Sequence, residues 1–282
     1  MIKKLLGALA LSLVCTLTFA AEGGVRLDRA PDRITDLAAL QNGAKLFVNY
    51  CLNCHSANSM RYNKLMDLGL TETEIKKNLL FSRDKIGDLM TVSMTPEDGK
   101  KWFGAAPPDL SVIARAKSTN FGPSGVDYIY TYLRSFYRDT TKKIGWDNTV
   151  FPSVAMPNVL WELEGPRTYT SIQVHEVADD SGATHWTRTT TVYDEAGFPT
   201  VKNEKLDGYK GESSQTGRFD SADAKTFSQF EHNVADLSNF LGWMAEPVQL
   251  ERKQIGVWVM LFLFLFLFVA IRMNHAYWKH VR

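Results

Sequence analysis

The chain has 282 residues, of which 45% are hydrophobic and 22% charged, as in an ordinary globular protein, and its net charge is +1. Between the two apolar ends, residues 22–251 contain 25 Lys and Arg against 31 Asp and Glu, a net charge of −6. This acidic balance disfavours nucleic-acid binding, and it would attract a basic soluble partner over long range.

The N-terminus has the layout of a secretory signal. Lys3 and Lys4 precede a short apolar run that ends at Phe19, and the small residues Ala20 and Ala21 follow it. A positive start, a short apolar core and a small-residue exit are typical of a signal peptide that is cleaved after export. We therefore expect residues 1–21 to be removed, and the chain that follows to lie in an oxidising compartment.

A short cysteine motif follows a predicted amphipathic helix at residues 37–50. Cys51-Leu52-Asn53-Cys54-His55 contains both cysteines that remain after export. A C-x-x-C pair can be a disulfide or a redox dithiol, but an immediately following His makes it the attachment signature of c-type haem. The two thiols then form thioethers with the haem vinyl groups, and the imidazole of His55 is the proximal iron ligand.

A proline-rich strip at 106–111 follows the motif. Pro107 and Pro108 favour an extended backbone whose carbonyls have no partner in regular structure. A ligating histidine needs a partner for its second ring nitrogen, and one of these carbonyls could hold the His55 ring. An ordinary surface loop is equally consistent with the composition.

The sixth iron ligand has several candidates. Met156 precedes Pro157 in an apolar loop at 150–157, and Pro157 biases it towards an extended backbone that suits a thioether ligand. Methionine more often packs in a core than binds a metal. The residues alone therefore do not decide between iron ligation and core packing for Met156. Met94 is the next candidate ligand. The remaining histidines and methionines of the exported part are His175, His185, His232, Met60, Met66, Met90 and Met244.

Residues 165–219 have a different pattern. The β-prone runs 168–177 and 184–193 are joined by Asp179-Asp180-Ser181-Gly182, which predicts a hairpin. The Gly- and charge-rich sequence at 202–218 predicts a mobile loop. We expect this insertion to be a surface elaboration.

The C-terminal part predicts two helices. An apolar stripe at 220–243, behind Asp220 or Ser221 as a cap, predicts an amphipathic helix that packs on the helix at 37–50. Ile255–Ile271 is a run of 17 residues without a charge, long enough to span about 25 Å as a helix. Trp258 lies near one end of it, and Arg272, Lys279 and Arg282 follow it, which predicts a single membrane anchor with a cytoplasmic tail.

Separated blocks of this chain resemble the cytochrome c1 family, the haem subunit of the cytochrome bc1 complex (ubiquinol:cytochrome c oxidoreductase). The blocks that carry the resemblance are Cys51–Met60, Met60-Arg61-Tyr62, Ala106–Ser111, Ile113-Ala114-Arg115, Val126–Tyr130, Phe151–Pro157 and Val234–Gly256. The resemblance covers most of the chain, and the segment 165–219 departs from it.

The resemblance implies roles for particular residues. It implies that Met156 is the sixth ligand of one covalent haem c, and that Arg115 and Tyr128 lie beside the haem. It also implies cytochrome b as the membrane neighbour, the Rieske iron–sulfur protein as donor, a c-type cytochrome as acceptor, and a dimeric complex. The chain itself would be an electron carrier within quinol–cytochrome-c reductase.

The expected fold is mainly α: a periplasmic c-type cytochrome domain at 22–250 with a β-hairpin insertion at 165–219, and one transmembrane anchor with a short tail at 251–282. The expected location is a bacterial inner membrane, with the haem domain in the periplasm. A membrane-anchored monohaem cytochrome of another oxidase or reductase, and a tethered thiol–disulfide protein without haem, are the alternatives.

Overall fold

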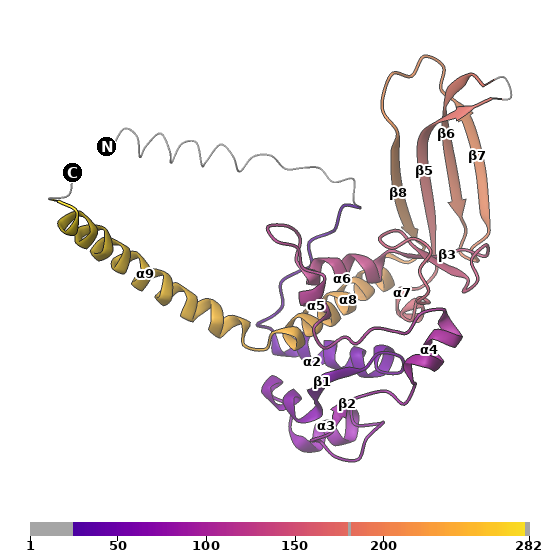
Figure 1. Ribbon diagram of the computed structural model, residues 1–282. Helices are drawn as coiled ribbons and strands as arrows, with labels where there is room; N and C mark the ends of the chain where they lie inside the picture. Colours follow the sequence, from indigo (N-terminus) through magenta and orange to yellow (C-terminus); the bar gives the residue numbers. More distant parts are fainter. Residues whose placement is uncertain (1–24, 180–181, 280–282) are drawn as a thin grey trace.

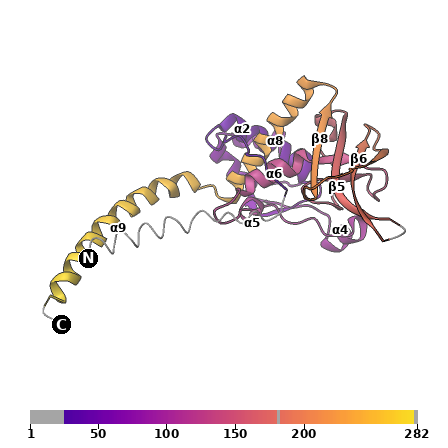
Figure 2. The ribbon, with the colours of Figure 1, turned by 90° about the horizontal axis from the view of Figure 1, so that it is seen from above.

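The computed structural model describes residues 25–179 and 182–279. The predicted signal peptide at 1–21 lies outside the described residues. Within them, a helical head carries a four-stranded sheet on one side and a long helix, α9, on another (Figures 1 and 2).

Two crossed helices form the centre of the head. Helix α2 (Leu37–Leu46) begins at Asp36, whose carboxylate accepts from the amides of Ala38 and Ala39. It continues into the π-helical turn η2 (Phe47–Cys51), so the predicted helix at 37–50 is confirmed with an irregular last turn. Helix α8 (Ala224–Ala245) begins at Asp223 rather than at the predicted Asp220 or Ser221, which belong to a strand.

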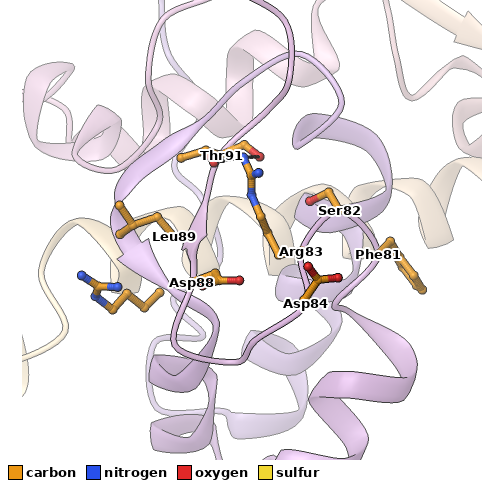
Figure 3. Close-up of a pocket in the computed structure, with 8 residues that line it drawn as sticks. Phe81, Ser82, Arg83, Asp84, Asp88, Leu89 and Thr91 are labelled. Atoms are coloured by element: carbon orange, nitrogen blue, oxygen red, sulfur yellow. Dashed lines mark hydrogen bonds between the residues drawn. The ribbon is translucent and has the colours of Figure 1, made fainter.

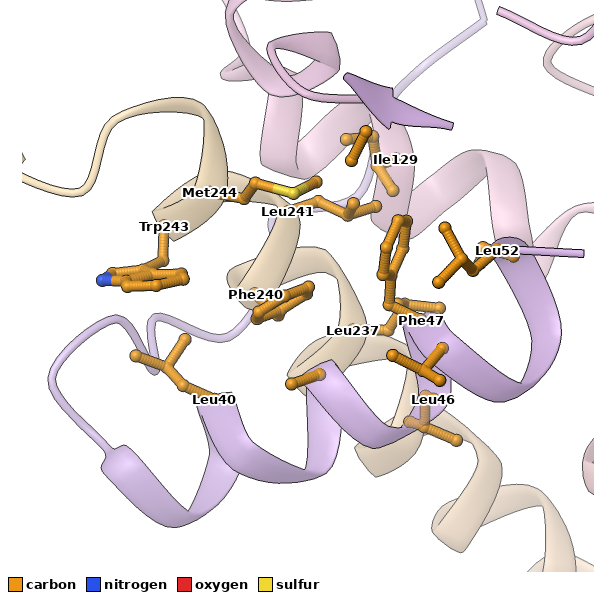
Figure 4. Close-up of a cluster of buried hydrophobic side chains, with 14 of the residues drawn as sticks. Leu40, Leu46, Phe47, Leu52, Ile129, Leu237, Phe240, Leu241, Trp243 and Met244 are labelled. Atoms are coloured by element: carbon orange, nitrogen blue, oxygen red, sulfur yellow. The ribbon is translucent and has the colours of Figure 1, made fainter. Parts of the chain in front are cut away.

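The two helices approach closely at Gly43. A Cβ atom built there would lie 2.3 Å from the Asp236 carbonyl oxygen and 2.5 Å from the Cβ of Phe240, so only glycine fits. Around this crossing, Phe47, Leu237 and Phe240 are fully buried and point towards one another (Figure 4). Burying each such side chain stabilises the head by about 1.5–3 kcal/mol, and Cys51 belongs to the same core cluster.

Short elements surround this core. In chain order they are β1 (Ala57–Arg61), the 3-10 helix η3 (Tyr62–Leu68), α3 (Glu72–Asn78), β2 (Leu89–Met90), α4 (Pro96–Phe103), α5 (Ile113–Ala116), α6 (Gly125–Arg134), β3 (Phe136–Arg138), β4 (Trp146–Asn148) and α7 (Trp161–Glu164). β1 pairs with β2 and β3 with β4, each pair antiparallel. The extended N-terminal segment crosses α6 and α8, where the amide of Ala30 donates to Asp127 and that of Arg33 to Asn239.

The insertion is a four-stranded antiparallel sheet, larger than the predicted hairpin. The hairpin itself is confirmed as β5 (Arg167–Ala178) and β6 (Thr184–Tyr193), in which the whole of β6 pairs with residues 169–178 of β5. Two further strands, β7 (Pro199–Lys205) and β8 (Ser214–Ser221), occupy most of the predicted mobile loop, in the sheet order β7-β6-β5-β8. Their side chains are mostly exposed, so they lack the hydrophobic alternation by which a strand is recognised.

Aromatic rings attach this sheet to the head. Tyr137 of β3 lies 4.4 Å from Tyr169 of β5 and 4.8 Å from Tyr193 of β6, measured between ring centroids, and Tyr169 lies 4.6 Å from Phe219 of β8. Contacts of this kind add about 0.5–1.5 kcal/mol per pair beyond the area they bury. The sheet is therefore packed onto the head at its base.

The fold class needs a correction. About 42% of the residues are helical and 20% are in strands, so the chain is an α and β protein rather than a mainly α one. The last helix, α9 (Gln249–Tyr277), is confirmed: over the described residues it alone is long and apolar enough to cross a membrane, with a mean hydropathy of 2.6 and no buried residue. It fits a single-pass anchor.

Candidate haem site

The cysteine motif lies at the end of the central helix. Cys51 closes η2 and is buried, and Cys54 is half-buried three residues later. The amides of Cys54 and His55 donate to the Cys51 carbonyl over 3.0 and 2.8 Å, which fixes a tight turn. Both thiols are free, as two thioether bonds to a haem require.

The two thiols have the wrong acidity for thiol–disulfide exchange. Burial, with a smaller contribution from Cys54, raises the pKa of Cys51 to about 12, and burial also raises the pKa of Cys54. Redox-active cysteines have lowered pKa values because the thiolate is the nucleophile. The raised pKa values of both thiols thus favour haem attachment over the dithiol alternative.

His55 is oriented by a main-chain carbonyl. Its Nδ1 lies 2.7 Å from the Pro108 carbonyl oxygen, so Nδ1 carries the proton and donates it, while Nε2 keeps its lone pair. Burial lowers the pKa of His55, although the Pro108 bond and the Asp109 charge act in the opposite direction. A neutral imidazole with a fixed tautomer is the form that ligates iron. The predicted carbonyl partner in the proline strip is present.

The strip itself is fixed to β1. The Leu110 amide donates to the Ser56 carbonyl over 2.9 Å, and the Asn58 amide donates to the Asp109 carboxylate over 2.7 Å. Pro107 packs on α4, because a Cβ built on Gly99 would lie 2.7 Å from the Pro107 ring. The Pro108 carbonyl is therefore held by contacts on both sides of it.

Met156 lies half-buried against the same core cluster that contains Cys51. The hydroxyl of Tyr132 on α6 donates to the Met156 sulfur over 3.6 Å. Burial raises the pKa of Tyr132, which keeps this hydroxyl protonated. A thioether sulfur has two lone pairs, so this bond leaves one for a metal.

Side chains fix the loop around Met156. Before it, the Asp147 carboxylate accepts from the Ser153 amide over 2.6 Å. After it, the Asn158 amide group donates to the Glu164 carboxylate over 2.6 Å, and Glu164 is 2% exposed. This pairing connects the loop to α7 only six residues further on.

Glu164 also forms a buried ion pair with Arg167. Burial raises the pKa of Glu164 to about 7 and lowers that of Arg167 to about 10, so for both groups the cost of removing the charge from water exceeds the gain from pairing. Arg167 also donates to the carbonyls of Arg134 and Phe136 at the end of α6. The sequence analysis did not predict a role for Tyr132 or Glu164. Tyr132 could have been recognised from its spacing, because it lies four residues after Tyr128 on one helix.

Tyr128 and Arg115 have different neighbours. Tyr128 stacks on Tyr132, with ring centroids 6.0 Å apart, and the ammonium of Lys117 lies 4.7 Å above the Tyr128 ring. Arg115 instead lines a hollow near Glu246, at the end of α8. The cation nearest to Tyr128 is thus Lys117, and a role for Arg115 beside a haem stays a prediction.

The other candidate ligands have structural surroundings of their own. Met60, Met90 and Met244 are buried in the core cluster, and Met94 is half-buried before α4. The histidines His175 and His185 belong to the sheet, and the ring of His232 lies 2.6 Å from Arg33.

The residues present fit a covalent haem c. Two free thiols and a neutral imidazole lie in one turn beside the core cluster, and a half-buried thioether with a spare lone pair packs against the same cluster. Half-exposed apolar side chains from several elements lie on the shared core, including Leu110, Ile113 and Tyr128. Such side chains are what an apolar macrocycle would cover.

A hollow of about 690 Å³ lies away from the haem residues, between β2 and the loop after α3 (Figure 3). Its two arginines are already engaged: Arg83 donates to Thr91, and Arg61 donates to the Gly87 carbonyl over 2.6 Å. These bonds close the loop at 82–91, and none of the predicted haem residues lines the hollow.

Comparison with known proteins agrees with this geometry. Residues 31–187 and 215–281 match the Cytochrome C1 family. The chain is 39% identical over 280 residues to cytochrome c1 of Allochromatium vinosum, with 99% of each chain covered. It is 36% identical over 281 residues to the ammonia monooxygenase gamma subunit of Nitrosomonas europaea, with 100% of this chain and 99% of that one covered.

A more distant relative is cytochrome c1 of Rhodospirillum rubrum, 25% identical over 266 residues that cover 88% of this chain and 83% of that one. The family match omits residues 188–214, which comprise the end of β6, β7 and the loop that leads to β8. The match continues through 165–187 and 215–219, so the departure from the family is narrower than the predicted 165–219. The chain belongs to the cytochrome c1 family, whose members carry covalently attached haem c.

Proposed function

We propose that this haem-carrying electron-transfer subunit of a cytochrome bc1 complex takes one electron from the Rieske iron–sulfur protein and passes it to a c-type cytochrome. The observation that carries the proposal is His55, next to two free thiols and with its tautomer fixed by the Pro108 carbonyl. Bound haem supplies the reversible exchange of one electron between its ferric and ferrous states. The protein supplies attachment, axial ligation and an apolar environment.

Each proposed site residue has a distinct task. Cys51 and Cys54 would hold the haem covalently, and His55 and Met156 would bind its iron. Since both ligands would come from the protein, no substrate would reach the iron, and the chain would act as a carrier within quinol–cytochrome-c reductase. Thioether ligation and exclusion of water favour the ferrous state and raise the reduction potential.

Tyr128 and a neighbouring cation would stabilise the haem carboxylates. Lys117 lies over the Tyr128 ring, and Arg115 lies two residues before Lys117 in the chain, on α5. Replacing Lys117 and Arg115 by Gln, one at a time, shows which of them lies beside the haem. Loss of that charge should lower the reduction potential, because a nearby positive charge counteracts the haem carboxylates. A reductive titration of each variant measures this.

The topology follows from the two ends of the chain. The signal sequence would direct the head to the periplasm of a bacterium, and α9 would anchor it in the inner membrane beside cytochrome b. Arg272 and Lys279 would then lie on the cytoplasmic side, as the positive-inside rule requires. The net charge of −6 between the ends would attract a basic acceptor.

The test is purification from native membranes through a tag on this chain. We expect a pyridine haemochrome spectrum of c-type haem, and the co-purification of cytochrome b and a Rieske protein as a dimeric complex. Absence of covalent haem would contradict the site. Haem without cytochrome b would contradict only the partner assignment.

A second candidate has one observation in its favour. The relative from N. europaea bears the name of an ammonia monooxygenase subunit, so this chain could instead serve another membrane oxidase. The same purification decides between the two, because that assignment requires a different membrane partner in place of cytochrome b and the Rieske protein.

A further inference from the structure

A hollow lined by three cations lies where the head meets the predicted membrane anchor. It has a volume of about 360 Å³ and is enclosed by the N-terminal segment, α5, the start of α6 and the elbow between α8 and α9. Three cations line it, one from each of three separate segments: Arg29, Arg115 and Lys253. None of the three has a carboxylate partner within 4 Å among the described residues.

Three acidic residues also line the hollow, and their carboxylates are engaged: that of Asp32 accepts from the Ile34 amide over 3.3 Å. The Asp127 carboxylate caps α6 by accepting from Ser124, and it also accepts from the Ala30 amide. Glu246 is paired with Arg252, outside the hollow. That pairing lowers the pKa of Glu246, and the charges of Arg115 and Lys253 contribute further. Arg115 and Lys253 therefore gather around one point without neutralising partners of their own.

The hollow lies beside the start of the predicted membrane-spanning run. Lys253 is in the second turn of α9, and the uncharged run begins two residues later at Ile255, about 3 Å further along the helix axis. Lys and Arg side chains at such a helix end extend towards the lipid headgroups. The elbow at Pro247, between α8 and α9, brings Arg29 and Arg115 of the head to the same level.

We propose that this hollow binds the phosphate group of an anionic phospholipid from the membrane that α9 enters. Arginine matches phosphate geometry with two parallel N–H donors, and lysine adds a compact charge. The exported region has a net charge of −6, which an anionic bilayer would repel. The three cations turn this repulsion into a local attraction at the elbow, and a bound headgroup there fixes the tilt of the head over the membrane.

The experiment uses the whole complex purified in detergent, because the inference needs only that α9 lies in the membrane and not that the electron partners are as proposed. Native mass spectrometry follows the binding of phosphatidylglycerol and of neutral phosphatidylcholine. The variant Arg29→Gln/Lys253→Gln removes two cations of the hollow and leaves Arg115 in place. Its control, Lys77→Gln/Lys210→Gln, removes the same charge from exposed lysines in α3 and the β7–β8 loop.

We expect one phosphatidylglycerol to bind the wild-type complex more tightly than phosphatidylcholine, and about 10- to 30-fold more weakly after the double substitution, since each cation near the surface contributes about 1 kcal/mol. The control should change binding by less than about twofold. Equal binding by both variants would overturn the proposal. Complete displacement of the lipid by excess inorganic phosphate would overturn the lipid assignment and leave a site for free anions.

A folding failure is separable from a binding failure. The covalent haem spectrum reports whether each variant assembles, and if the double variant does not, Arg29→Gln alone is expected to weaken binding about fivefold. If the chain were absent from the membrane fraction altogether, the anchor would be wrong. Absence of any preference for phosphatidylglycerol in the wild-type complex, with cytochrome b still attached, would count against the hollow alone.

Discussion

The two sides of the proposed haem site are held by different parts of the chain. On the His55 side, the atom that orients the ligand is a main-chain carbonyl, that of Pro108, and the cysteines belong to the same turn. On the Met156 side, the atom that touches the ligand is a side-chain hydroxyl, that of Tyr132, and the loop is fixed by carboxylates and amides.

This difference has a consequence for substitutions. A main-chain carbonyl survives the replacement of its own side chain, whereas a hydroxyl or a carboxylate does not. The Met156 side should therefore be easy to perturb by point mutation, and the His55 side should resist it. The four predictions below test this contrast.

The largest effect is expected for Met156→Leu. Loss of the thioether leaves the haem attached through Cys51 and Cys54, but it lowers the reduction potential by on the order of a few hundred millivolts, because axial ligands set much of the range of haem potentials. The vacant position should also bind carbon monoxide in the reduced state. Redox titration and the carbon monoxide difference spectrum measure the two effects.

A control and a contradicting result accompany this variant. Met94→Leu removes a half-buried methionine before α4 and should change neither property. An unchanged potential in Met156→Leu, with no carbon monoxide bound, would move the sixth ligand to Met94 or to a histidine.

The next largest effect concerns the ion pair behind the Met156 loop. Burial raises the pKa of Glu164 to about 7 in the folded chain, against an ordinary value of 4.5. The folded state therefore binds the proton more tightly than the unfolded state, so stability is gained as the pH falls from about 7 towards 4.5 and is lost as the pH rises again. We expect a gain of about 1–3 kcal/mol in the free energy of unfolding.

Glu164→Gln should remove this slope, because the amide cannot ionise. Urea unfolding of the wild type and the variant at several pH values measures it. The exposed Glu162, on the same short helix, provides the matched control Glu162→Gln, which should keep the slope. A slope that persists in Glu164→Gln would assign the titration to another group.

A smaller effect is expected for Tyr132→Phe. The hydroxyl draws electron density from the Met156 sulfur, which makes the sulfur a weaker donor to ferric iron and favours the ferrous state. Its loss should lower the reduction potential by about 20–60 mV, since a hydrogen bond contributes about 0.5–1.5 kcal/mol and 59 mV corresponds to a factor of ten for one electron. Tyr130→Phe removes a hydroxyl from the same helix and is the control; a shift of equal size there would rule out a specific bond to sulfur.

The contrast also explains what the sequence could predict. The Cys51–His55 motif and the proline strip are local patterns, so spacing alone predicts the haem signature, and the Pro108 carbonyl contact confirms one of the two interpretations that the strip allowed. The two crossing helices followed from helical periodicity. The anchor followed from 17 uncharged residues, although the helix extends beyond them at both ends.

The Met156 side was less accessible to this reasoning. Tyr132 and Glu164 meet the loop only through the fold, and an isolated Tyr or Glu has no pattern that distinguishes it from a surface residue. The residues alone left ligation and core packing by Met156 even. Strands β7 and β8 were missed for a related reason: their exposed polar side chains resemble a loop, and their pairing is set by neighbouring strands rather than by their own sequence.

The smallest effect is expected for Pro108→Ala. The carbonyl that accepts from His55 Nδ1 remains, and Leu110 and Asp109 still hold the strip on β1, so the potential should stay within about 20 mV of the wild type and the haem should remain fully attached. Only stability should fall, by about 0.4–1 kcal/mol, because alanine gives the unfolded chain more freedom. Redox titration and urea unfolding of the same sample separate these outcomes. A shift in reduction potential as large as that of Tyr132→Phe would show that the proline ring, and not its carbonyl, positions the imidazole. Both the His55 side and the Met156 side of the site would then depend on side chains.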